Sequence, residues 1–225
     1  HLASGAMKAQ TRKPGLKHPL RLYDQLFGMF RWPTFLLTVV CYGAWFISFD
    51  IPFPPILQTP LLVIAAIAWV VYIFTLIAPG FYYVQCHSNY VVISAFYPLA
   101  ISYSRIGNTV PVNFATKYPF RRQSWSERRL LEPLFYEQKT GQLTVVAMQL
   151  RGYPLPPFWL RIWFHKYMFF PYQDGPGFLF NVRNWMALSH EIEDYRETWR
   201  ARRSARKLKG GTIASQVLKK GERRR

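Results

Sequence analysis

The sequence lacks Lys and Arg from residue 32 to residue 104, although the chain carries 29 basic and 11 acidic residues in all. Two uncharged segments, 32–49 and 61–78, lie in this gap, and each would be about 27 Å long as a helix. That length matches the hydrocarbon core of a bilayer, where one Lys or Arg costs about 2.5–3.5 kcal/mol. Two core helices of a soluble protein are the alternative, but they would not need so long a gap. We therefore predict a transmembrane helical hairpin at 32–80.

Cysteine is scarce, and the motifs of common enzymes are absent from the sequence. Cys41 and Cys86 have no metal-type spacing, so we expect two buried thiols without a disulfide. The histidines after residue 7 show no ligand spacing either, and HEIED at 190–194 lacks the second His of a metalloprotease helix. There is no GxSxG segment, phosphate-binding glycine loop or Cys–His pair. We therefore expect no metal, no cofactor and no enzymatic activity.

Basic residues on both sides of the gap predict the orientation of the hairpin. The segment before it contains one acid, Asp24, and six basic residues: Lys8, Arg12, Lys13, Lys17, Arg21 and Arg31. The connecting loop at 48–60 has four prolines and no basic residue, and the chain is basic again from Arg105 onward. The positive-inside rule then places both termini in the cytoplasm and the loop outside. We expect a multi-pass protein of the inner (cytoplasmic) membrane.

Proline and glycine predict where the two helices begin and end. Pro33 is suited to the first turn of the first helix, and Pro60 immediately precedes the second. APG at 78–80 is typical of a helix end. The opening residues, HLASGAM, are either additions that end at Met7 or a native start, and no signal peptide is visible. We assign 1–31 to a basic cytoplasmic segment.

After the hairpin the pattern changes to short strands followed by one helix. Runs of β-branched and aromatic residues occupy 81–86, 90–95, 98–106, 143–150 and 177–182. HSN at 87–89 and Gly141 mark turns, and Leu143, Val145 and Ala147 alternate along one face. An apolar stripe with helical spacing then follows a suitable N-cap, Asn184: Trp185, Leu188, Ile192, Tyr195 and Trp199. These patterns predict an α+β domain at 81–200 and a basic tail at 201–225.

This order of parts resembles that of bacterial membrane proteins with two transmembrane helices and a PH-like domain. In that family a segment of the type I-P-x-S-x-I follows the first hairpin, and here ISYSRI at 101–106 has Ser102 in place of the proline. FNVRNWMALSHEIEDY at 180–195 is similar to the family's last strand and C-terminal helix. The resemblance covers roughly 30–200 and implies a bent β-barrel or sandwich closed by an amphipathic helix, without enzyme activity. It carries over no ligand site, and this chain departs from the family at 115–140 and 151–171.

The segment at 151–177 contains nine Phe, Trp and Tyr residues and has three interpretations. It could form two strands of the barrel, with Leu160, Ile162 and Phe164 on one face and Arg161, Trp163 and His165 on the other. It could equally form an interfacial helix between Pro157 and Pro171, lying in the headgroup layer. A third interpretation is a surface that docks on another membrane subunit, since aromatic residues and Arg favour interfaces. The sequence leaves these alternatives open.

Two basic groups lie in the cytoplasmic part. The first is at 117–129, and the second, from Arg196 onward, holds twelve Lys or Arg against Glu197 and Glu222. Anionic lipid headgroups are one expected partner and other membrane protein subunits another, whereas a membrane anchor disfavours nucleic acid. A solvated charge run that only sets topology is the simplest alternative. The candidate partner- or lipid-binding residues are Lys117, Arg121, Arg122, Arg128, Arg129, Trp159, Arg161, Trp163, Arg200, Arg202 and Arg203.

Together these features predict a non-catalytic membrane-anchored scaffold, an accessory or stabilising subunit of a larger membrane complex that docks through aromatic and basic surfaces. An anionic-lipid-binding PH-like protein of the envelope or of a stress response is the alternative. A transporter is disfavoured because the two apolar segments offer no polar pathway.

Overall fold

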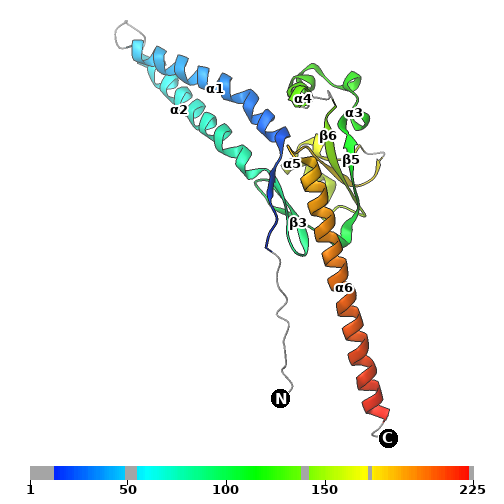
Figure 1. Ribbon diagram of the computed structural model, residues 1–225. Coiled ribbons are helices and arrows are strands. Elements are labelled where there is room, and N and C mark those ends of the chain that lie inside the picture. Colours follow the sequence, from blue (N-terminus) through cyan, green and yellow to red (C-terminus); the bar gives the residue numbers. More distant parts are fainter. Residues whose placement is uncertain (1–12, 49–54, 138–141, 172–173, 223–225) are drawn as a thin grey trace.

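The computed structural model describes residues 13–48, 55–137, 142–171 and 174–222, with side chains throughout except at 55–57, 120, 136–137 and 207–222. Two long helices, α1 (Arg21–Ile47) and α2 (Pro55–Ile77), form a hairpin that projects from a β-rich domain (Figure 1). Both are long and apolar enough to cross a membrane, which confirms the predicted pair of apolar helices. The loop predicted at 48–60 is shorter than expected, because Pro55 to Pro60 belong to α2, and its middle part, 49–54, lies outside the described residues, as does the turn at Gly141.

Helix α1 begins at Arg21 rather than at Trp32. Its first turns are held by tertiary contacts, because Leu22 and Tyr23 are buried in the β-rich domain. Pro33 therefore lies in the helix interior and not in its first turn, and Pro60 likewise lies inside α2. Both proline predictions were wrong because the preceding residues already continue the helix. The predicted stop at 78–80 is confirmed, since α2 gives way there to the short helix η1 (Ala78–Phe81).

In the described part of the chain, seven strands form two antiparallel sheets. The first sheet has the order β1 (Lys17–Pro19), β2 (Tyr83–Cys86), β3 (Tyr90–Ser94) and β4 (Leu99–Ser102). The second has the order β5 (Ile106–Asn113), β6 (Thr144–Leu150) and β7 (Gly177–Phe180). The strands predicted within 81–106, 143–150 and 177–182 are confirmed. Leu143, Val145 and Ala147 are buried, in line with the predicted apolar face. Val146 and Met148 between and beside them are buried as well, so β6 is covered on both faces.

The two sheets do not close into the barrel that the resemblance implied. After β4 the chain turns through η2 (Tyr103–Arg105), and β5 then pairs with β6 instead of β4. At the opposite edges, β1 and β7 meet only through an isolated bridge between Leu20 and Val182. The fold is therefore α+β with two sheets around a shared core, and the backbone ladder is interrupted at both seams.

The residues before the hairpin belong to the same core as the residues after it. Strand β1 pairs with β2, and the backbone N–H of Gly15 donates to the carbonyl of Cys86 at 2.7 Å. His18 and Glu191 form a largely buried pair at 3.0 Å, which ties β1 to the C-terminal helix. The predicted domain boundary at residue 31 was therefore wrong: residues before the hairpin pack in the β-rich domain, and the hairpin is inserted between two parts of that domain. Both cysteines are buried and no disulfide joins them, as predicted.

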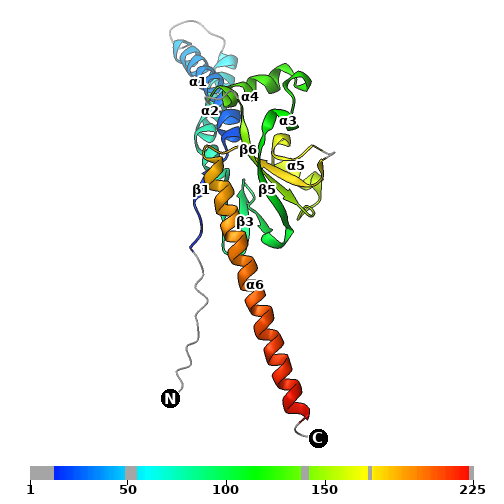
Figure 2. The same cartoon turned by 45° about the vertical axis from the view of Figure 1, so that its right-hand side comes forward.

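Helix α6 (Trp185–Glu222) covers the sheets and then continues past them. Its N-cap is confirmed, since Asn184 Oδ1 accepts a hydrogen bond from the N–H of Ala187 at 3.0 Å. Leu188, Ile192 and Tyr195 are buried, which confirms the predicted apolar stripe. The region predicted as a separate tail continues the same helix to Glu222. In both views α6 runs away from the hairpin (Figures 1 and 2).

The connections among the described residues include the helices α3 (Phe114–Lys117), η3 (Phe120–Arg122), α4 (Trp125–Glu137), α5 (Pro157–Trp163) and η4 (Lys166–Met168). Helix α4 buries Leu130, Leu131 and Leu134 and packs against α1. Helices α4 and α5 lie in 115–140 and 151–171, the two segments in which this chain departs from the family that its sequence resembles.

We expect Gly177→Ala to destabilise the fold. A Cβ atom at this position would lie 2.9 Å from the Met148 carbonyl and 2.8 Å from the Phe170 ring, so β6, β7 and the ring cannot keep their spacing. Overpacking of this kind costs about 1–3 kcal/mol. Thermal unfolding in detergent should show the loss, whereas Gly152→Ala, which meets nothing within 4 Å, should unfold close to the parent chain. Equal unfolding of the two variants would contradict this packing.

Candidate interaction surfaces at the hairpin base

Tyr23 fastens the base of the hairpin to the domain. Its ring stacks on Tyr82 with centroids 3.7 Å apart, and its hydroxyl accepts a hydrogen bond from the N–H of His165 at 2.9 Å. Phe27, one turn further along α1, contacts both Tyr82 and Phe74 of α2. Burial raises the pKa of Tyr82 to about 12, so this cluster stays uncharged at physiological pH. The hairpin, the first sheet and the segment after α5 thus share one aromatic cluster.

Arg31, the last basic residue before the Lys- and Arg-free segment, lies at the same base. Its Nε donates to the carbonyl oxygen of Thr75 at 3.4 Å, within the last turn of α2. The final carbonyls of a helix lack intrahelical partners and carry partial negative charge. Arg31 therefore stabilises the end of α2 and joins the two helices where they enter the domain.

Helix α5 settles the structure of the aromatic-rich segment. Leu160 and Phe164, four residues apart, face the core, whereas Ile162 between them is exposed. The two-strand interpretation was wrong, because helical spacing rather than alternation selects the buried positions. Pro156 and Pro157 precede and open the helix, where the missing N–H of proline costs no hydrogen bond. Its outer face carries Phe158, Trp159, Ile162 and Trp163, and Phe158 is 72% exposed.

Exposed aromatic residues continue from α5 to the hairpin. The ring of Trp163 lies 6.3 Å from that of Tyr97, in the turn between β3 and β4. Phe96, the neighbour of Tyr97, stacks on Phe74 of α2 at 5.6 Å. We call the outer face of α5 together with Phe96 and Tyr97 the aromatic rim. It is a continuous apolar surface that begins at the lower end of the hairpin.

The first basic group lies beside this rim. Arg121 and Arg122 are exposed on η3, and Arg128 and Arg129 are exposed on α4. The Arg129 guanidinium lies 5.6 Å from the ring of Trp125, which is 75% exposed. We call these four arginines, with the exposed Arg161 of α5, the basic flank. Both views place α4 beside the lower end of α1, against which it packs (Figures 1 and 2).

An ion pair and a tyrosine hold the rim and the flank together. Lys166, just after α5, pairs with Glu127 of α4. This contact with Lys166 lowers the pKa of the Glu127 carboxyl to about 2, so the pair persists at physiological pH. Tyr118 donates from its hydroxyl to the carbonyl of Phe169 at 2.8 Å, which ties the chain before η3 to the chain after η4. The two surfaces are therefore one structural unit.

Lys117, although predicted within the first basic group, has partners inside the domain. Its Nζ lies 2.8 Å from Asp174 Oδ2 and 5.7 Å from the centre of the Phe170 ring. The structure therefore places Lys117 apart from the four exposed arginines. The predicted residues Trp159, Arg161 and Trp163 do lie together on α5, next to them.

The predicted residues Arg200, Arg202 and Arg203 lie elsewhere, on the part of α6 that leaves the domain. Arg203 lies over the ring of Trp199, at 5.3 Å from its centre, and Trp199 is the last residue that packs against the core. Beyond it α6 continues to Glu222 and projects away from the hairpin (Figure 2). We call this projecting part, from Arg200 to Glu222, the helical arm. The tail and the first basic group are thus separate surfaces.

A groove of about 590 Å³ lies on one face of the hairpin itself. It is lined by Thr38, Val39, Tyr42 and Gly43 of α1 and by Leu62, Ala65, Ala66 and Trp69 of α2. These positions follow helical spacing on both helices, so the groove runs between them along a single face. Small residues form its floor, and an aromatic side chain from each helix borders it.

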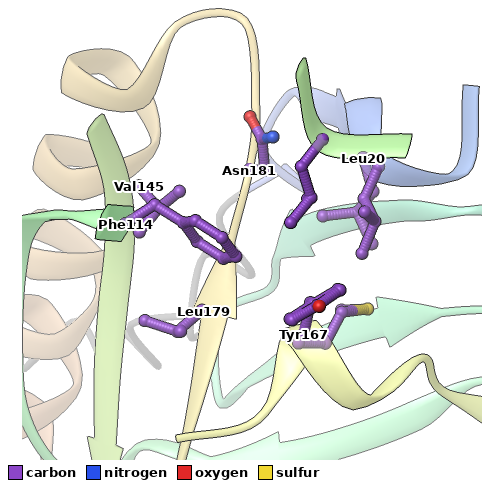
Figure 3. A pocket seen from close by; sticks show the side chains of 9 residues that line it. Leu20, Phe114, Val145, Tyr167, Leu179 and Asn181 are labelled. Carbon is purple, nitrogen blue, oxygen red and sulfur yellow. The ribbon is translucent and has the colours of Figure 1, made fainter. Parts of the chain in front are cut away.

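A second, much smaller cavity lies inside the domain. Figure 3 shows a cavity of about 10 Å³ between the two sheets, where Leu20, Phe114, Val145 and Asn181 are among the nine lining residues. A cavity of this size holds one water molecule at most. Asn181 Oδ1 is buried and has no hydrogen-bond partner among the described residues.

Within the described ranges, no group of three or more His, Cys, Asp or Glu side chains could hold a metal ion. His18 and Glu191 form a largely buried pair, but they lie between β1 and α6, where they join the two elements. Comparison of the chain with protein-family models, with curated proteins and with solved structures finds no match.

Sequence reasoning missed several residues of these surfaces. Phe96, Tyr97 and Trp125 were not selected, because an exposed aromatic residue in a strand turn or a short helix carries no periodic signal. Phe158 and Ile162 became visible as surface residues only when α5 proved helical. The available signal was the pair of prolines at 156–157, which favours a helix start.

We expect the free energy of unfolding to fall when His165 becomes protonated. Burial lowers the pKa of His165 below its ordinary value of 6.5, and its Nδ1 accepts a hydrogen bond from the N–H of Tyr167. Between the two pKa values the unfolded chain binds the proton and the folded chain does not, so stability is lost as the pH falls below about 6.5. His165→Asn keeps a side-chain acceptor but does not titrate.

The measurement is thermal unfolding in detergent at about pH 7.5 and about pH 5.5. The parent chain should lose more stability than His165→Asn over this range, because only the parent chain carries the buried imidazole at this position. An identical loss in the two chains would show that His165 is not responsible.

Proposed function

We propose that this chain is a non-catalytic, membrane-anchored scaffold, an accessory or stabilising subunit of a larger membrane protein complex. In this proposal α1 and α2 cross the inner membrane, and both termini with the β-rich domain lie in the cytoplasm. The domain is PH-like, a proposal supported by its division into four and three strands and by the closing helix α6.

The exposed surface of the hairpin supports insertion into a membrane. Val40 and Val70 are each 65% exposed, and Phe46 and Ile67 are also more than half exposed. Apolar patches of this extent are rare on soluble monomers and mark contact with lipid or protein. A core helix of a soluble domain would bury these residues. The hairpin therefore needs an apolar environment that its own chain does not supply.

The groove between α1 and α2 is the observation that carries the scaffold proposal. Membrane helices associate by close packing at small residues, because lipid provides no hydrophobic driving force between them. The groove is floored by Gly43, Ala65 and Ala66, which permit close approach, and Tyr42 and Trp69 border it. Its occupant in this proposal is an apolar transmembrane helix of a partner subunit.

The helical arm supports a second point of attachment. It leaves the domain on the side opposite the hairpin, so it extends from the membrane into the aqueous phase (Figure 1). Lipid headgroups could not reach its far end in this arrangement. In this proposal Arg200, Arg202 and Arg203, at the start of the arm, bind the cytoplasmic part of the same partner complex.

Topology is tested by labelling intact cells with a membrane-impermeant maleimide. Asp50→Cys in the connecting loop should react, whereas Ser104→Cys and Arg203→Cys should react only after permeabilisation. The reason is that the positive-inside rule keeps the basic flanks in the cytoplasm. The native cysteines are buried, so the parent chain provides the background. Labelling of Ser104→Cys in intact cells would contradict the orientation.

Filling the groove should release the chain from its complex. We expect the double variant Gly43→Leu/Ala66→Leu to migrate as a small species on native gels after gentle extraction, because the added side chains occupy the space of the partner helix. The parent chain should migrate with the larger complex.

Val70→Leu is the matched control, since Val70 is exposed on α2 outside the groove and should leave the complex intact. If the parent chain itself migrates alone, the scaffold function is wrong. If the double variant stays in the complex, lipid rather than a partner helix occupies the groove.

A further inference from the structure

We propose that the aromatic rim and the basic flank together form an interfacial binding surface that lies in the headgroup layer of an anionic membrane leaflet. This inference rests on the proposed function, because it requires α1 and α2 to be in the bilayer. It assigns an occupant to the exposed face of the domain and explains how the domain is held relative to the membrane.

The position of the rim supports lipid as the occupant. Phe74 belongs to the apolar part of α2, and Phe96 stacks on it at 5.6 Å, so the rim starts where the hairpin leaves the bilayer. From there Tyr97 contacts Trp163, which carries the surface outward to α5. Arg31, beside Thr75, marks the same level on the other helix. A surface that begins at this level and extends sideways meets the headgroup layer first.

The side chains of the rim suit an interface between water and hydrocarbon. Tryptophan and tyrosine are enriched at this depth, because their rings are apolar and their N–H or O–H groups are polar. Helix α5 presents Trp159 and Trp163 outward together with Phe158 and Ile162, while its inner residue Leu160 is buried. A short helix with one core face and one aromatic outer face can lie flat in this layer without crossing it.

The charge of the flank selects an anionic leaflet. Five arginines lie on η3, α4 and α5, and the acids described on these elements are Glu127, which pairs with Lys166, and Glu132. Each basic side chain close to an anionic membrane surface increases the affinity of the protein for that membrane roughly fivefold. Guanidinium groups also bind phosphate oxygens in a bidentate manner. Arg129 over Trp125 places both types of side chain at one point.

Contact on both sides of the hairpin base would define the orientation of the domain. The hairpin, α4 and α5 are joined through Tyr23, His165 and the Lys166–Glu127 pair, so they move as one unit. With the rim and flank on the leaflet, α6 must point away from the membrane, as it does relative to the hairpin in both views.

The test uses the full chain, labelled with an environment-sensitive fluorophore and reconstituted in vesicles that contain headgroup spin-labelled lipid. The label is attached at Phe158→Cys in the rim or, as a matched control, at Asn108→Cys, which is exposed on β5 next to the α6 contact at Gly107. In vesicles of phosphatidylcholine and phosphatidylglycerol, we expect quenching at position 158 to exceed that at position 108 several-fold. In phosphatidylcholine alone the difference should shrink.

A charge variant separates lipid contact from anionic selectivity. Arg121, Arg122, Arg128 and Arg129 are changed together to Gln, and all four are exposed, so the fold should be kept, as near-ultraviolet circular dichroism can verify. We expect quenching at position 158 to fall several-fold in the anionic vesicles and to lose its dependence on phosphatidylglycerol. Unchanged dependence on phosphatidylglycerol would overturn the role of the flank.

Three further results would overturn the inference. Equal quenching at positions 158 and 108 would place the rim in water. Shielding of position 158 in native membranes but not in lipid vesicles would show that a protein covers it. A label at Val70→Cys serves as the control for the hairpin, and its failure to be quenched by deeply placed spin labels would overturn the proposed function itself.

Discussion

The burial of the first turns of α1 inside the β-rich domain is the constraint on which the rest of the structure depends. A helix that merely led into the hairpin through a loop would leave the domain free to rotate. Instead, Leu22 and Tyr23 are part of the core, and the Tyr23 hydroxyl binds the backbone of His165. The same helix therefore belongs to the domain at one end and to the apolar hairpin at the other, so the two parts share one orientation.

This coupling fixes the position of the surfaces around the hairpin base relative to the hairpin. Because the hairpin is inserted between β1 and β2, the seam bridged by Leu20 and Val182 lies at its base. Helix α4 packs against α1, and the segment after α5 binds Tyr23. Aromatic and basic side chains on these segments are held by buried contacts on their inner faces. The helical arm is held on the opposite side by the same core, through Ile192 and Tyr195. The chain thus presents one surface next to the hairpin, around α4 and α5, and a second one, the helical arm, on the opposite side of the domain.

The element types were largely predictable, and the reason differs between regions. The length of the two segments without charged residues identified the two long helices. A charged side chain in an apolar environment is costly whichever residues surround it, so this signal can be read without knowing the packing. Short strands and the stripe from Trp185 to Trp199 followed from local periodicity. Strand β1 escaped prediction because three residues, KHP, have no periodicity of their own and become a strand only by pairing with β2. The sequence identified the candidate basic residues, but it could not show which of them form ion pairs inside the domain. Lys117, which pairs with Asp174, is an example.

Composition alone determined that two segments avoid water and that charge collects outside them, because both are properties of side chains summed over a window. Only the tertiary structure decided that the domain is assembled from both sides of the hairpin, that the sheets stay open, and that α5 is a helix with an outward aromatic face. Those outcomes depend on contacts between residues far apart in the chain, such as Leu20 with Val182 and Lys166 with Glu127. No local pattern encodes the partner of such a residue, since the energy that selects it arises only when both are buried together.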